Sequence, residues 1–149
     1  MAAGETGPDG PALEELTREE CLRLIAGPAV GRIAVCVAGQ APHVVPVNYV
    51  LDGDDVVFRT DPGLKLDAVG RGPATFEVDH VDPVHRSGWS VLVQGPLALL
   101  GGDETAGMAA DPAPWAGGRK ESWVRLVASS VTGRRIVLPD VPRDGRGYL

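Results

Sequence analysis

The sequence predicts a mainly β (α+β) fold, in which six or seven short strands form a small antiparallel barrel with one helix inserted between the third and fourth strands. Twenty glycines and thirteen prolines among 149 residues favour many turns and short strands over long helices. Short apolar stretches of alternating polarity also recur between these turn-forming residues. A chain of this length can bury a real core, so one domain is expected.

A short helix opens the predicted domain. Thr17, followed three residues later by Glu20, forms a capping box, and the apolar residues after it fall near one helical face. Gly27 and Pro28 end this helix, because glycine favours a helix C-terminus and proline cannot continue the helical hydrogen bonds. We therefore expect a packing helix between Thr17 and Gly27.

Three strands follow as a meander. Residues 30–37 alternate well enough for a strand, residues 38–40 form a turn, and residues 44–51 are the partner strand. The Asp-Gly-Asp sequence at 52–54 is a second tight turn, so residues 55–60 should return beside the second strand.

The second half of the chain adds further strands around a long loop. Because proline cannot donate to a central ladder, Gly95-Pro96 predicts a bend or bulge inside a strand, as at a barrel corner. The expected segments are a helix at 62–70, strands at 74–78, 89–100, 123–129 and 133–138, a polar loop at 79–88, and a loop with one helical turn at 101–120.

The domain itself is expected over residues 13–139. Residues 1–12 are rich in Gly, Pro and Ala with little to pack, so they predict a disordered N-terminal arm. Residues 140–149 are expected to form a polar C-terminal tail.

The charge balance restricts the possible ligands. A net charge of −6 with scattered basic residues argues against nucleic-acid binding, so an anionic ligand must be held by a local cluster. Only two of the fourteen basic residues are lysines, Lys65 and Lys120, so a lysine in a motif is not background composition.

The remaining composition favours a cytoplasmic protein without membrane partners. Cys21 lies in a helical pattern and Cys36 in a strand pattern, which favours buried free thiols over a disulfide framework. No apolar run is long enough to span a bilayer, and no signal-peptide layout is present. We therefore expect the protein to be soluble and cytoplasmic.

The junction between the third strand and the helix after it carries the most informative side chains. Arg59 and Thr60 end the predicted strand, and Lys65 lies early in the predicted helix. Asp61 is a good N-cap, and Pro62 at the first helical position loses only an amide hydrogen that would stay unpaired. A phosphate placed there would meet free backbone N–H groups, the positive end of the helix dipole, a hydroxyl and two cations. The alternative is a capped helix with solvated charges.

Other constellations favour structural roles. The spacing of His80, Asp82 and His85 fits no standard zinc or iron pattern, so a polar loop without a metal is expected. No Gly-x-Ser-x-Gly elbow accompanies the serines, so nucleophilic hydrolysis has no support.

Short motifs occur along the chain in a fairly specific order. They are Val30-Gly31-Arg32-Ile33-Ala34, Pro46-Val47-Asn48-Tyr49, Val57-Phe58-Arg59-Thr60, Gly63-Leu64-Lys65-Leu66 and Gly88-Trp89-Ser90-Val91. In this order and spacing they resemble the pyridoxamine 5'-phosphate oxidase-like, FMN-binding split β-barrel family, in the branch common in actinobacteria, over roughly residues 16–137. The resemblance implies a six- to seven-stranded antiparallel split barrel with short flanking helices.

The resemblance also implies a homodimer with two flavin sites between its subunits. Arg59, Thr60 and Lys65 match the contacts to the phosphate and ribityl chain of FMN. This agrees with the phosphate site inferred above at the same three residues, which is called the phosphate cradle below. The residues that would lie along the isoalloxazine ring are Val45, Pro46, Val47 and Asn48.

Aromatic and polar residues from elsewhere would close the site. By the same resemblance, Trp89 and Ser90 would close it from a neighbouring strand or from the second subunit, and Trp115 is a weaker candidate for the pocket wall. Leu64 belongs to the cofactor-binding set but stands where relatives often carry Ser or Thr, so one hydroxyl contact is missing. The segment 66–75 is also shorter than usual.

The function implied by the resemblance is FMN-dependent hydride transfer through flavin N5, between the flavin and a reduced nicotinamide or another small organic substrate. No His follows His85, although Arg134 and Arg135 are present, so true pyridoxamine-phosphate oxidation is not expected. Two alternatives stay open, a deazaflavin-dependent reductase of the same fold and a non-catalytic module that binds flavin or haem. No catalytic side chain is identified.

Overall fold

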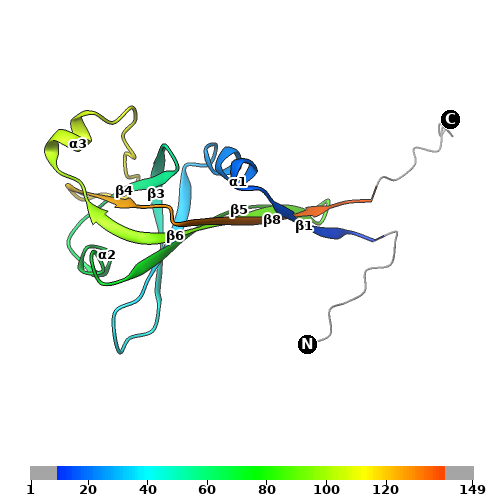
Figure 1. Cartoon of the computed structure of the whole chain (residues 1–149), viewed down its shortest axis with the longest axis horizontal. Coiled ribbons are helices and arrows are strands. Elements are labelled where there is room, and N and C mark those ends of the chain that lie inside the picture. Colours follow the sequence, from blue (N-terminus) through cyan, green and yellow to red (C-terminus); the bar gives the residue numbers. More distant parts are fainter. Residues whose placement is uncertain (1–9, 140–149) are drawn as a thin grey trace.

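The computed structural model describes residues 10–139, and within this range short helices flank a predominantly β structure (Figure 1). The predicted N-terminal arm and C-terminal tail lie outside the described residues, apart from residues 10–12. The elements in chain order are β1 (Ala12–Leu16), α1 (Arg18–Ile25), β2 (Val30–Val35), β3 (His43–Asp52), β4 (Asp55–Thr60), α2 (Leu64–Asp67), β5 (Pro73–Asp82), β6 (Ser87–Leu99), α3 (Gly102–Ala106), β7 (Ser122–Leu126) and β8 (Ser130–Val137).

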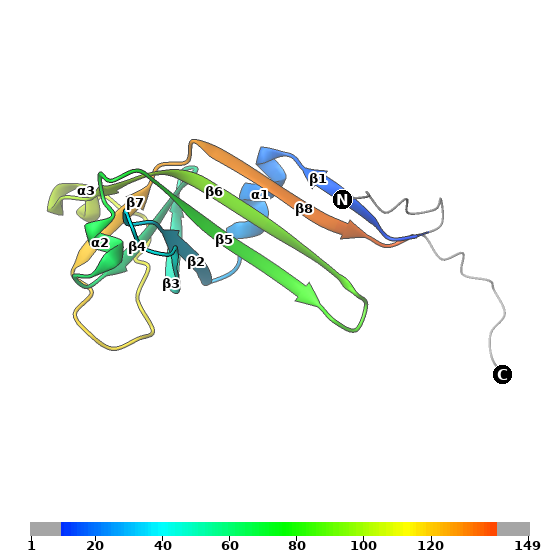
Figure 2. The same ribbon diagram turned by 90° about the horizontal axis from the view of Figure 1, so that it is seen from below.

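Six of the strands close into an antiparallel barrel. The ring runs β2-β3-β4-β7-β6-β5, and the pairing of β5 with β2 completes it. The remaining strands extend the sheet beyond β6, where β8 pairs with β6 and β1 pairs with β8. Figure 2 shows β5, β6 and β8 as long neighbouring ribbons that run away from the barrel. The predicted mainly β antiparallel barrel is confirmed.

Strand β6 belongs to both parts of the structure because it bends at Gly95 and Pro96. Beyond the bend, the backbone N–H of Val127 donates to the Pro96 carbonyl at 2.9 Å, and that of Ser129 donates to the Gln94 carbonyl at 2.9 Å. A Cβ atom at Gly95 would collide with the Val127 carbonyl oxygen, so only glycine fits this crossing. The bend predicted from Gly95-Pro96 is confirmed.

The core fills the barrel with alternating inward side chains from every barrel strand. Phe58 and Phe76 are fully buried, and the Phe76 ring meets Tyr49 edge-on with 4.7 Å between ring centroids. Gly31 on β2 makes room for Phe76, because a Cβ atom there would overlap the ring. Helix α1 packs against β8 and buries Cys21 and Ile25, and the Tyr49 hydroxyl donates to the carbonyl of Ile25 at the helix end.

The first helix starts as its sequence predicts. The Glu20 backbone N–H donates to the Thr17 hydroxyl at 3.2 Å, and the Thr17 N–H donates to the Glu20 carboxylate at 2.8 Å. The Thr17 backbone N–H, followed by the Thr17 hydroxyl, hydrogen-bonds the Glu20 carboxylate and holds its pKa below its usual value. The capping box is confirmed.

Three expectations differ from the structure. Strand β1 was not predicted, and it begins at Ala12, inside the predicted arm, because β8 supplies its partner from the far end of the chain. The predicted loop at 79–88 is mostly strand, because the Asp82 carboxylate accepts from the N–H groups of Val84 and His85 and turns the chain within a few residues. Cys36 is exposed, whereas Cys21 is buried as expected.

No helix in residues 10–139 has the length and apolar character that crossing a membrane requires.

Candidate functional site

The predicted phosphate cradle lies at the end of β4, where the chain enters α2. Arg59 and Thr60 are the last residues of β4, and Leu64 and Lys65 open α2. Thr60 is 2% exposed, and its hydroxyl donates to the Asp61 carbonyl at 3.0 Å. The hydroxyl proton of Thr60 is therefore already engaged within the chain.

Asp61 does not cap α2, which corrects the predicted helix at 62–70. Both of its carboxylate oxygens face Lys120, one accepting from the backbone N–H at 2.6 Å and the other lying 3.0 Å from Nζ. These contacts hold the pKa of Asp61 below its usual value. Helix α2 consequently starts at Leu64 without a side-chain cap and spans only Leu64–Asp67. A helix this short presents little dipole, so the cradle depends on its side chains.

Arg59 is held on three sides. Its Nη1 lies 3.2 and 3.3 Å from the two carboxylate oxygens of Asp111, and its Nε donates to the Lys120 carbonyl at 2.9 Å. The guanidinium also lies over the Trp123 ring, 5.4 Å from the centroid. The side chain is only 21% exposed. Arg59 is therefore fixed in place by the connection before β7 and by Trp123 within β7.

Lys65 is the cation of the cradle that makes no ion pair within residues 10–139. Partial burial lowers its pKa, the positive charge of Lys120 adds to this effect, and Asp61 opposes it. Lys65 thus lies in a partly desolvated, positively charged setting. An anion placed beside it would relieve that repulsion.

The four β3 residues predicted to lie along a ring do not share one face. Val47 is buried in the barrel core and Val45 packs against that core, whereas Pro46 and Asn48 lie on the outer face. The Asn48 amide donates to the Ala29 carbonyl at 3.3 Å. Only the outer side chains and the backbone of β3 are placed to meet a ligand outside the barrel.

Trp115 lies close to this outer face of β3. Its backbone N–H donates to the Asn48 side-chain oxygen at 2.8 Å, and its ring is 76% exposed. The structure thus brings the Trp115 backbone to the Asn48 side chain.

Trp89 and Ser90 lie far from the cradle within one chain. They pair with Arg135 and Arg134 on β8, and Leu97, where β6 first pairs with β7, lies eight positions after Trp89. At about 3.3 Å per strand residue, this is roughly 26 Å measured along the strand. Figure 2 shows α2 and the turn between β5 and β6 at opposite ends of the molecule.

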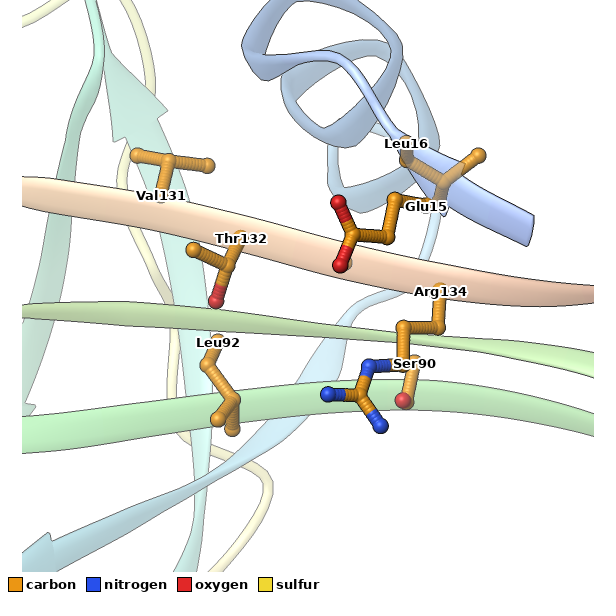
Figure 3. A pocket seen from close by; sticks show the side chains of 8 residues that line it. Glu15, Leu16, Ser90, Leu92, Val131, Thr132 and Arg134 are labelled. Atoms are coloured by element: carbon orange, nitrogen blue, oxygen red, sulfur yellow. The ribbon is translucent and has the colours of Figure 1, made fainter. Parts of the chain in front are cut away.

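Ser90 instead lines a groove of about 520 Å³ on the face of β6, β8 and β1 (Figure 3). Arg134 lies directly opposite Ser90 on β6 and Glu15 on β1. Leu92 and Thr132 continue the wall, and in Figure 3 both extend to the same side of the strands as the Arg134 guanidinium. The groove has both polar and apolar walls, and its charged residues are Arg134 and Glu15.

Sequence reasoning missed the partners of the cradle, Asp111 and Lys120. Nothing in the local pattern of residues 101–120 marks them, because each contacts a side chain about 50 to 60 positions earlier in the chain. The scarcity of lysine was a usable signal, since the two lysines of the chain meet in one cluster.

In the turn between β5 and β6, His85 contacts Asp82. The His85 Nδ1 atom lies 2.6 Å from an Asp82 carboxylate oxygen, which lowers the pKa of Asp82. No group of three metal-ligating side chains converges within residues 10–139.

The fold and site define a split β-barrel protein with a basic cradle at the entrance to α2. The chain belongs to the pyridoxamine 5'-phosphate oxidase family, whose sequence profile matches residues 17–135. The resemblance inferred from the motifs is confirmed.

Individual relatives support the same assignment. The chain is 32% identical over 130 residues to the uncharacterized protein Rv0080 of Mycobacterium tuberculosis, covering 83% of this chain and 85% of that protein. It is similar to the FAD binding protein from Mycobacterium smegmatis, with 31% identity, a TM-score of 0.62, and coverage of 83% of this chain and 98% of that one. It is also similar to a putative pyridoxamine 5'-phosphate oxidase from Corynebacterium glutamicum, with 28% identity, a TM-score of 0.72, and coverage of 91% and 100%.

Proposed function

We propose that this protein binds a flavin nucleotide by its phosphate at Arg59 and Lys65, and acts as an oxidoreductase on a small molecule. FMN is the proposed cofactor. The similarity to an FAD binding protein makes FAD the flavin to test beside it, and both nucleotides carry the phosphate that the cradle would hold. The deazaflavin alternative and a non-catalytic module that binds a flavin nucleotide would use the same cradle, whereas a haem-binding module, whose ligand has no phosphate, would not.

The observation that carries this proposal is the charge of the cluster around Lys65. Arg59, Lys65 and Lys120 contribute three cations, and Asp61 and Asp111 contribute two carboxylates. The excess of positive charge lies on Lys65, in a chain whose net charge is −6. A phosphate dianion would neutralise this excess with charge-assisted hydrogen bonds.

The residues present fit a flavin phosphate through their cations rather than through hydroxyls. The Thr60 hydroxyl already donates its hydrogen bond to the Asp61 carbonyl, and the Leu64 side chain has no polar group. Pro46, Asn48 and the exposed Trp115 ring border the outer face of β3, where they would bound the flavin ring and exclude water from one side. The flavin, when bound, would supply hydride transfer at its N5.

The active form is proposed to be a homodimer, because Trp89 and Ser90 can contribute to the cradle of another copy but not to their own. A groove of about 380 Å³ near Trp89 exposes apolar side chains from three strands, Leu13 on β1, Val81 on β5 and Ile136 on β8. Such a row of exposed apolar residues is suited to burial against a second subunit.

Titration of the protein with FMN, FAD, riboflavin and a deazaflavin tests the proposal. Binding of FMN or FAD together with much weaker binding of riboflavin, which lacks the phosphate, is expected. Equal affinity for riboflavin and FMN would exclude the phosphate cradle. Tighter binding of the deazaflavin than of FMN would show that the cofactor is a deazaflavin. Reduction of the bound flavin by NADH or NADPH without oxygen, followed by turnover with an acceptor, separates an enzyme from a storage protein.

A further inference from the structure

Residues 107–121 connect α3 to β7 and form a strap across the barrel end that carries the cradle. Polar contacts at several points fasten this strap. They include Trp115 to Asn48 on β3, Asp111 to Arg59 on β4, and Lys120 to Asp61. Figure 2 shows the strap as the long loop below α2, β4 and β7. The strap therefore contacts both the outer face of β3, where the flavin ring is proposed to lie, and the phosphate cradle.

The contact between Asp111 and Arg59 uses the part of the guanidinium that an external anion would need. Both Asp111 oxygens face Nη1, at 3.2 and 3.3 Å, while Nε is taken by the Lys120 carbonyl. The Nη2 atom donates to the Arg119 carbonyl at 3.5 Å, so a phosphate oxygen would approach Arg59 through the remaining hydrogens of Nη1 and Nη2, at the edge next to the Asp111 carboxylate. One carboxylate and one phosphate cannot share this edge without strong repulsion.

The surroundings allow the Asp111 side chain to leave without unfolding the strap. Its carboxylate is 55% exposed, whereas the next residue, Pro112, is buried and fixes the backbone. An ion pair whose carboxylate is open to solvent in this way is weak. A rotation of the Asp111 side chain into solvent is thus sufficient to free Nη1.

We infer that Asp111 is an internal competitor for the phosphate of the ligand, so that it weakens the affinity of the cradle for phosphorylated flavins. This inference rests on the proposed function. The alternative is a positioning role, in which the ion pair with Asp111 would hold Arg59 in the orientation that binds the phosphate. The two roles predict opposite effects of removing the carboxylate.

The test compares the affinities of FMN and riboflavin, measured by flavin fluorescence at low salt, in the wild type and in Asp111→Asn. The control is Asp103→Asn on α3, which makes the same change of net charge at a residue without an ion pair in the described part of the chain. Asp111→Asn should bind FMN ~2- to 5-fold more tightly, with riboflavin unchanged. Asp103→Asn should leave both affinities unchanged.

Weaker FMN binding by Asp111→Asn would overturn the inference in favour of positioning, and unchanged binding would show that no competition exists. Equal gains for FMN and riboflavin would also overturn it, because the effect would not involve the phosphate. If no variant and no wild type binds FMN, the proposed function fails, and the inference fails with it. Unchanged thermal unfolding temperatures would show that the variants are folded.

Discussion

Asp61 and Lys120 contact each other twice, through the backbone N–H of Lys120 at 2.6 Å and through its Nζ at 3.0 Å, although 58 residues lie between them. This double contact joins the end of β4 to the start of β7. It also explains why Asp61 serves a long-range contact instead of capping α2.

The lowered pKa of Asp61 predicts a dependence of stability on pH. Because the folded value lies below the unfolded value of about 3.9, the Asp61 contact is fully stabilising above that value and is lost as the pH falls through the lower folded value. Urea unfolding from about pH 5 to about pH 2.5 should therefore show a smaller loss of stability in Asp61→Asn than in the wild type. Asp67→Asn, which changes an exposed carboxylate in α2, should behave like the wild type.

The cradle predicts a selective loss of flavin binding in Lys65→Ala. A charge-assisted contact to a phosphate is typically worth about 1.5 to 3 kcal/mol, so FMN affinity should fall roughly ten-fold or more. Arg59→Ala should have an effect of similar size. Arg71→Ala, which removes an exposed cation shortly after α2, is the matched control and should change FMN affinity little. Wild-type affinity in both Lys65→Ala and Arg59→Ala would exclude the cradle.

The fit of Gly31 against Phe76 predicts a steric effect on stability. Gly31→Ala would push a methyl group into the buried Phe76 ring and should lower the free energy of unfolding by about 1 to 3 kcal/mol. Phe76→Leu removes the ring atoms that clash. In a double-mutant cycle measured by denaturant unfolding, Gly31→Ala should cost less in the Phe76→Leu background. Purely additive costs would contradict a direct clash.

The apolar groove beside Trp89 predicts the site of dimerisation. A charge placed there by Ile136→Arg should convert the proposed dimer, of twice the 15.6 kDa chain mass, into a monomer in light scattering. Val84→Arg, at the exposed turn between β5 and β6 and outside this groove, is the control and should stay dimeric. A dimer that persists in Ile136→Arg would place the interface elsewhere.

Local signals predicted the elements whose partners are close in the chain. The Thr17–Glu20 capping box, the glycine turn at Gly53 and the bend at Gly95-Pro96 each act over a few residues, and each was recognised from the sequence. The barrel itself followed from the number and spacing of such segments.

Features that depend on contacts between distant parts of the chain were not predicted by local signals. Ala12–Leu16 has two adjacent glutamates and no strand-like alternation, and it is a strand because β8 offers a free edge. Asp61 has the sequence of an N-cap, but Lys120 competes for its carboxylate with a cation and an N–H together. Asp111 carries no local signal of its contact with Arg59.

The pairing of β1 with β8 has a consequence for synthesis of the chain on the ribosome. Ala12 lies opposite Val137, so the first strand has no partner until nearly the whole described chain has emerged. Strand β6 likewise contacts β5, β7 and β8, and so the barrel cannot close before residues well beyond 120 are available. Strand β1 is thus among the last elements to find its partner, and the barrel with its β1–β8 extension should complete folding only after β8 has emerged.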